Sequence, residues 1–154
     1  MTLNTTIEGQ RDWAKIIEAN FGQLIGEHTK SKNIVLLNGW EAVDNNKSLD
    51  SYTLLGGQKI YVFTGFLHKQ NLTPNENGWL CNFPEAAKLL SGPFPTTVDV
   101  SYDGHVGGYL SITVGTVGGV GMYYNFTPND GATNPEAAKP HDVKVQFASA
   151  WLGN

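Results

Sequence analysis

Aromatic residues beside polar turns are the part of this sequence best suited to binding chemistry. Trp40 follows an Asn-Gly pair, Asp103 and His105 flank an expected hairpin tip, and Tyr123 opens a Tyr-Tyr pair. Aromatic rings stack on the apolar faces of sugars, while carboxylate, imidazole and phenol groups hydrogen-bond to sugar hydroxyls. We expect most rings of the chain to lie in the core. The residues beside turns with polar neighbours are therefore the better candidates, and the predicted ligand-binding residues are Trp40, Asp103, His105 and Tyr123.

The sequence lacks the usual catalytic constellations. There is no Gly-x-Ser-x-Gly motif, and the four histidines are scattered with no i,i+4 pair. With 14 acidic residues in the chain, some pair of carboxylates always looks plausible, so solvated charges are the favoured interpretation. The single Cys81 favours a buried thiol, because one cysteine makes neither an internal disulfide nor a multi-cysteine metal site. We therefore expect no enzyme, no catalytic residue, no metal and no cofactor.

The composition of the chain excludes some classes of binding partner. The 154 residues suffice for one ordinary domain, with 16% charged residues, a net charge of −4 and no run of Lys or Arg. The electrostatic footprint of a nucleic-acid binder is therefore missing. No apolar run approaches the roughly 20 residues of a membrane span, and the polar first ten residues do not resemble a signal peptide. We expect a protein made in a cytoplasm that binds neither nucleic acid nor a membrane.

Residues 8–28 show helical periodicity. Apolar residues recur every three or four positions on one face, at Trp13, Ile16, Ile17, Phe21, Leu24 and Ile25. A helix this short is marginal alone, so its stripe must pack on something. Two partners remain open, namely the β domain of the same chain and a short parallel coiled coil at a symmetry axis. Residues 1–30 are predicted to be an N-terminal helix used for oligomerisation or attachment.

From Asn33 onward the segments become short, β-branched and punctuated by glycine. Asp103-Gly104 between two alternating runs predicts a hairpin, and Asn45-Asn46 and Gly56-Gly57 predict turns. Because adjacent strand residues point to opposite faces, only one of Tyr123 and Tyr124 is expected in the core. Strands are predicted at 33–38, 51–55, 58–67, 78–83, 96–102, 105–114, 118–126 and 142–151. Such spacing suits a sandwich, a jelly roll or a small barrel over residues 31–154.

Several short motifs occur in a familiar order. Residues 8–21 contain Trp-Ala-Lys-Ile followed by Asn-Phe, and residues 36–40 read Leu-Leu-Asn-Gly-Trp. Two strand-like segments at 52–54 and 57–65 follow, and then Asn-Phe-Pro-Glu at 82–85. This order resembles tail and baseplate proteins of phages that infect Gram-positive bacteria. The chain departs from that pattern at 86–88, where Ala-Ala-Lys replaces the usual Gly-Tyr-Arg-Pro, and residues 115–154 have no counterpart in it.

The resemblance implies a mainly β protein, with an N-terminal α-helix followed by an antiparallel, jelly-roll-like β-sandwich head. It implies a homotrimer located in the virion, with other baseplate and tail proteins as partners. The implied function is host adhesion by binding a cell-surface saccharide. A purely structural baseplate or tail connector is the main alternative, and a cell-wall polysaccharide hydrolase is the least favoured. The resemblance transfers no binding residue position by position.

Overall fold

A computed structural model describes residues 25–86, 89, 95–102, 105–116, 119–129 and 139–154. Most of the helix predicted over 8–28 lies outside these residues. Its last part is wrong, because residues 25–28 open strand β1 (Ile25–Ser31), which pairs with β3. Backbone pairing along a neighbouring strand overrides the helical period here. The β structure therefore begins before the boundary predicted at residue 31.

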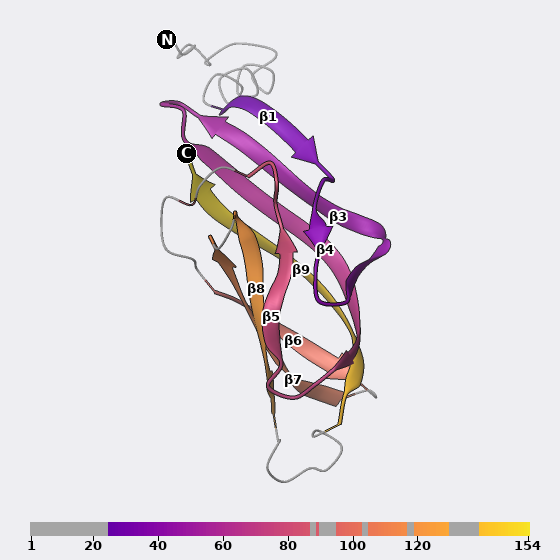
Figure 1. The fold of residues 1–154 in the computed structure, drawn as a ribbon. Helices are drawn as coiled ribbons and strands as arrows, with labels where there is room; N and C mark the ends of the chain where they lie inside the picture. Colours follow the sequence, from indigo (N-terminus) through magenta and orange to yellow (C-terminus); the bar gives the residue numbers. More distant parts are fainter. Residues whose placement is uncertain (1–24, 87–88, 90–94, 103–104, 117–118, 130–138) are drawn as a thin grey trace, which may run out of the picture.

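The described residues form two antiparallel sheets, which confirms the mainly β, two-sheet prediction (Figure 1). Sheet A has the order β1-β3-β4-β9, and sheet B has the order β2-β5-β8-β7-β6. The remaining strands of sheet A are β3 (Trp40–Leu54), β4 (Lys59–Leu72) and β9 (His141–Gly153). Sheet B contains β2 (Val35–Leu36), β5 (Asn77–Asn82), β6 (Thr96–Tyr102), β7 (His105–Gly115) and β8 (Gly121–Pro128).

The strand connections distinguish between the two-sheet topologies that the sequence left open. Strands β5 to β8 lie in the spatial order β5-β8-β7-β6, which is a Greek key. The pairs β3–β4, β6–β7 and β7–β8 are consecutive neighbours within one sheet. A jelly roll instead crosses between its sheets at most connections. The head is therefore a Greek-key sandwich rather than the jelly-roll-like arrangement implied by the resemblance.

The core lies between the two sheets. Strand β9 alternates strictly, with its inward side chains buried and its outward ones exposed from Val143 to Leu152. Phe63 is fully buried against the rings of Phe83 and Phe147. This alternation is the period-2 pattern of a sheet with one solvated face. Each sheet therefore presents one outer side, and any ligand site on the sheets must use one of these two surfaces.

Strand β3 contains a wide bulge where the sequence predicted a turn. Its pairing with β4 shifts from Ala42↔Leu67 to Lys47↔Gly65, so five steps along β3 match two along β4. Asp44 and the following Asn45 adopt left-handed backbone angles with φ 51 and 54. Asp and Asn tolerate this region better than other non-glycine residues. The predicted turn residues are thus accommodated inside one long strand.

The β6–β7 hairpin follows the sequence prediction. Tyr102 pairs with His105, which leaves the two-residue connection predicted at Asp103-Gly104. The pairing shifts once between Val100 and Ser101 and then runs on to Thr96 opposite Ile112. This hairpin forms the β6 edge of sheet B.

Candidate functional site

The outer side of sheet B carries rings and neutral polar groups in cross-strand rows. Trp79, Tyr123 and Thr113 lie opposite one another on β5, β8 and β7. The next row outward along β8 holds Asn77, Asn125, Ser111 and Thr97, and the third holds Thr127, Tyr109 and Asp99. All ten side chains are exposed or partly exposed. We call this surface, made of these ten residues, the aromatic face.

Trp79 and Tyr123 form the aromatic centre of this face. Their ring centroids lie 5.7 Å apart at an interplanar angle of 82°, an edge-to-face arrangement. Two glycines make room for the indole, because a Cβ added at Gly115 or Gly121 would lie 3.2 Å from its atoms. The absence of these side chains lets the Trp79 ring lie close over the backbone of the neighbouring strands.

Hydrogen bonds orient the phenol and amide beside the rings. The Tyr123 hydroxyl donates to Asn77 Oδ1 at 2.5 Å. Tyr123 and Tyr109 remain 36% and 38% exposed, so each presents a ring to solvent. Asp99 is the only charged side chain among the ten, so the face combines π surfaces with amides and hydroxyls at low charge. That combination suits a neutral hydroxylated ligand.

A partly buried polar network joins β4, β8 and the connection between β4 and β5 next to the face. Lys69 Nζ lies 3.1 Å from Glu76 Oε1, and the Tyr124 hydroxyl donates to the same oxygen at 2.5 Å. The Thr73 backbone N–H and hydroxyl both donate to Glu76 Oε2 at 2.9 Å. Burial raises the pKa of Glu76, but the hydrogen bonds from Thr73, Tyr124 and Lys69 outweigh it, so the net shift is downward. Burial and the nearby Glu76 carboxylate together raise the pKa of Tyr124.

The Asn-Gly-Trp motif at residues 38–40 is connected to the same polar network. Asn38 and Gly39 have φ 52 and 78, and the Lys69 ammonium donates to the Asn38 carbonyl. The Asn38 amide donates to the backbone oxygen of Trp79 at 2.8 Å. This turn therefore joins the end of the β2 segment to β5 at the backbone of Trp79. Its role in the described structure is to position Trp79.

Of the four ligand-binding residues predicted from sequence, the structure places the side chains of Trp40 and Tyr123. Trp40 is 3% exposed and packs edge-to-face on Tyr124 at 5.4 Å, so neither of its ring faces is open to a ligand. Asp103 lies outside the described residues, and His105 is placed by its backbone alone, at the start of β7. Tyr123 points outward while Tyr124 is 1% exposed, as expected for one core residue of the pair.

Sequence reasoning missed Trp79, Tyr109 and the amides Asn77 and Asn125 as neighbours of Tyr123. Asn77 and Trp79 alternate along β5, and Tyr123 and Asn125 alternate along β8. That period-2 signal shows that each pair shares a face of its strand. The strand register that brings the two pairs together is a tertiary property, and local sequence patterns do not predict it.

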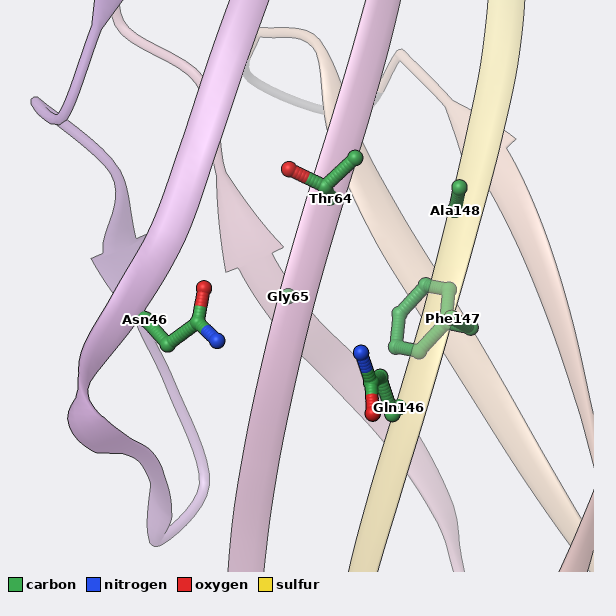
Figure 2. Close-up of a pocket in the computed structure, with 6 residues that line it drawn as sticks. All are labelled: Asn46, Thr64, Gly65, Gln146, Phe147 and Ala148. Atoms are coloured by element: carbon green, nitrogen blue, oxygen red, sulfur yellow. The ribbon is translucent and has the colours of Figure 1, made fainter.

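The outer side of sheet A carries a pocket of about 320 Å³ (Figure 2). Its lining residues come from β3, β4 and β9, and they are Asn46, Thr64, Gly65, Gln146, Phe147 and Ala148. It offers two amides and a hydroxyl, but no exposed aromatic ring comparable to Trp79 or Tyr123. The aromatic face is therefore the better candidate for sugar stacking.

Neither a metal cluster nor a membrane helix is found in the described part of the chain. No group of three or more His, Cys, Asp or Glu side chains lies close enough together to hold a metal ion there. The same residues contain no helix with the length and hydrophobicity to cross a membrane. The Cys81 thiol is buried, and burial raises its pKa to about 12.

The fold defines an antiparallel two-sheet β head, and a solved structure shares it. The crystal structure of the receptor binding protein (gp15) of Listeria phage PSA superposes with a TM-score of 0.51, at 12% sequence identity. The match covers 92% of this chain and 73% of that chain. At this identity the similarity shows a shared fold, and at that level it agrees with the resemblance to phage proteins. No known protein family and no curated protein matches the sequence.

Proposed function

We propose that this chain is a phage tail-tip or baseplate protein that attaches the virion to its host by binding a cell-surface saccharide on the aromatic face. The observation that carries the proposal is the pair of outward rings, Trp79 and Tyr123, framed by amides and hydroxyls. The shared fold with a phage receptor binding protein supports the adhesion role. The proposed function includes no bond-breaking step.

A sugar fits this surface for two physical reasons. The C–H faces of a pyranose stack on Trp79 and Tyr109, which removes apolar surface from water on both partners. The side chains of Asn77, Asn125 and Ser111 lie in the row between these two rings and exchange hydrogen bonds with the hydroxyls. Open, flat sites of this kind bind each sugar weakly, so adhesion would depend on many copies acting together.

The test is adsorption of the purified protein to host cells and to extracted cell-wall glycans. Replacing Trp79 with Ala should lower binding by at least about tenfold, since its ring supplies on the order of 1.5 kcal/mol of stacking. Tyr123→Ala should have a similar effect, because Tyr123 packs edge-to-face on the indole and holds it in position. Tyr52→Ala is the matched control, because Tyr52 is a partly exposed tyrosine on sheet A. Equal binding by Tyr123→Ala, Trp79→Ala and the control would rule out the aromatic face as the adhesion site.

We further propose that the protein acts as a homotrimer in the virion, with other baseplate or tail proteins as its partners. The predicted helical stripe of Trp13, Ile16, Ile17 and Leu24 supports this assembly, because a symmetry axis would bury the stripe three times over. Light scattering coupled to size-exclusion chromatography tests the state directly. A stable monomer at micromolar concentration would contradict the trimer while leaving the aromatic face unaffected.

A purely structural connector is the second candidate. The observation that favours it is the apolar character of one end of sheet A, where Ile60, Val62 and Leu152 point outward. Leu152 is 39% exposed, and such a patch suits contact with another protein of the particle. Under this alternative, host cells and glycans bind neither the native protein nor its variants. Assembly of the particle then fails when Leu152 is replaced by Ser.

A further inference from the structure

Two pockets lie on the outer side of sheet A, around the β3 bulge. A pocket of about 390 Å³ at the bulge adjoins the one shown in Figure 2, and Asn46 lines both. A hydrogen bond of 2.9 Å between Ser48 Oγ and Thr64 Oγ1 joins one lining residue of each pocket. The two pockets adjoin at Asn46, and we call the surface that they line together the bulge groove.

The bulge end of this groove concentrates positive charge. The chain has a net charge of −4 and only 10 Lys and Arg residues, yet Lys30, Lys32 and Lys47 all line this pocket. Asp44 is the only carboxylate that lines it. A local excess of ammonium groups on an acidic protein favours an anionic ligand.

Two of the three ammonium groups have no carboxylate partner within the described ranges. Lys47 Nζ donates to the neutral Asn45 Oδ1 at 3.2 Å, and Lys32 forms no ion pair there. Lys30 Nζ lies 3.9 Å from Asp50 Oδ2, and the other oxygen of that carboxylate is 3.0 Å from His28 Nε2. Lys32 and Lys47 are thus the cations available to a ligand.

The other end of the groove has different chemistry. Figure 2 shows Asn46 on β3, Thr64 on β4 and Gln146 on β9 around the pocket. Their amides and hydroxyl supply both donors and acceptors, and the described lining of this end carries no charge. Such a lining suits the hydroxyl groups of a sugar or polyol.

We propose that the bulge groove binds a phosphorylated sugar or polyol, with the phosphate between Lys32 and Lys47 and the hydroxylated part beside Asn46 and Gln146. Ammonium–phosphate hydrogen bonds are charge-assisted and stronger than neutral ones. The phosphate can belong to a free metabolite or to a phosphodiester polymer, and both present the same chemistry to the lysines. The groove is on sheet A, so it is independent of the aromatic face on sheet B.

The test is an NMR titration of the ¹⁵N-labelled full chain with inorganic phosphate, glycerol and glycerol phosphate. Glycerol phosphate should bind at least about fivefold more tightly than phosphate, because it fills both ends of the groove. Amide signals of residues 44–48 and 146–148 should shift. Equal affinity for phosphate and glycerol phosphate, or shifts elsewhere only, would overturn the proposal. A synthetic glycerol-phosphate oligomer then separates the sources, since tighter binding of the oligomer per phosphate indicates a polymer ligand.

Three charge variants sharpen the test. Lys32→Gln combined with Lys47→Gln should weaken glycerol phosphate binding by about tenfold or more, whereas Asp44→Asn should strengthen it by removing a repulsive charge. Lys59→Gln is the matched control, because Lys59 lies on the same sheet about 17 Å along β4 from Thr64. If Lys59→Gln weakens binding as much as the double variant, the binding reflects net charge alone and the proposal fails.

A variant of the uncharged end completes the design. Gln146→Ala should weaken binding of glycerol phosphate by about threefold or more and leave inorganic phosphate unchanged, since only the former reaches this end. Gln146 is exposed on β9, so the fold should tolerate the change. Tyr123→Ala, on the other sheet, should alter neither affinity. An equal loss for both ligands in Gln146→Ala would contradict the two-part arrangement.

Discussion

The Trp79 and Tyr123 rings stand edge-to-face, 5.7 Å apart, on the outer side of sheet B. The pairing of β5 with β8 places them directly opposite each other. The backbone of Trp79 is also held in place, because its carbonyl oxygen accepts a hydrogen bond from the Asn38 side chain. The rings are thus held in place before any ligand arrives, which lowers the entropy cost of binding.

Two glycine variants test the position of the Trp79 indole. In Gly115→Ala the new Cβ lies 3.2 Å from Trp79 Cη2, so the ring must shift by a few tenths of an ångström while the backbone stays in place. We expect a folded protein with altered near-UV circular dichroism and weakened host-cell binding. In Gly121→Ala the Cβ lies 2.5 Å from the backbone oxygen of Cys81, which cannot move alone.

Gly121→Ala should therefore destabilise the protein by about 2 kcal/mol or more in urea unfolding, through disruption of the β5–β8 ladder. Gly115→Ala should change the unfolding midpoint little. The reverse ranking of the two variants would show that β5 and β8 do not approach each other at Gly121 as closely as the structure places them.

Trp40→Ala tests whether the tryptophan of the Asn-Gly-Trp motif is a core residue. Its ring is 3% exposed and packs on Tyr124, so its removal leaves a large cavity. We expect a loss of about 3–5 kcal/mol in the free energy of unfolding. Urea denaturation followed by circular dichroism measures it, and a loss comparable to that of the exposed Tyr123→Ala, below about 1 kcal/mol, would contradict the assignment.

Glu76 makes stability depend on pH in the acid range. Its pKa is lowered in the folded protein from an ordinary value of 4.5, so the unfolded chain binds this proton more readily. The stabilisation is fully present above pH 4.5 and is lost as the pH falls through the lower folded value. Thermal unfolding from pH 7 to pH 3 should show this loss.

Glu76→Gln supplies the control for that pH dependence. The amide keeps the shape of the side chain but removes the charge facing Lys69, which costs on the order of 1–3 kcal/mol at pH 7. The variant should therefore lose less stability than the native protein between pH 5 and pH 3. Parallel curves for the two proteins would show that other carboxylates govern the acid range.

Cys81 should be chemically inert in the native protein. The thiol is fully buried, and its pKa of about 12 leaves almost no thiolate at pH 8. We expect no reaction with a thiol-specific chromophore in buffer and one thiol per chain in denaturant. Rapid labelling without denaturant would show that the β5–β8 region opens readily.

Alternation and turn chemistry made much of the fold predictable. Strand β6 occupies the predicted range 96–102, and β7 and β9 differ from prediction by one or two residues at their ends. Their β-branched and aromatic residues repeat with period 2, and Asp103-Gly104 marks the hairpin between β6 and β7. Local signals suffice where the burial pattern of a segment is strong.

Strands β1 and the first part of β3 escaped prediction because their residues are polar or follow another period. Residues 41–48 hold mostly charged and amide side chains, and the strand there is fixed by pairing with β4 rather than by its own burial. Ile25 fits the helical stripe in sequence yet pairs with Leu54 in the sheet. Backbone hydrogen bonds to a neighbour decided both cases.

The sequence by itself determined an aromatic-rich β protein with few charged residues, and the outward direction of one residue in the Tyr123-Tyr124 pair. Only the tertiary structure decided that Tyr123 is the outward one, that Trp79 stands beside it, and that Trp40 lies in the core. Strand alternation is a local property of the backbone, so it can be predicted from the sequence. Which strands become neighbours, and in which register, depends on how the two sheets bury their inner faces together, and residues distant in sequence meet only then.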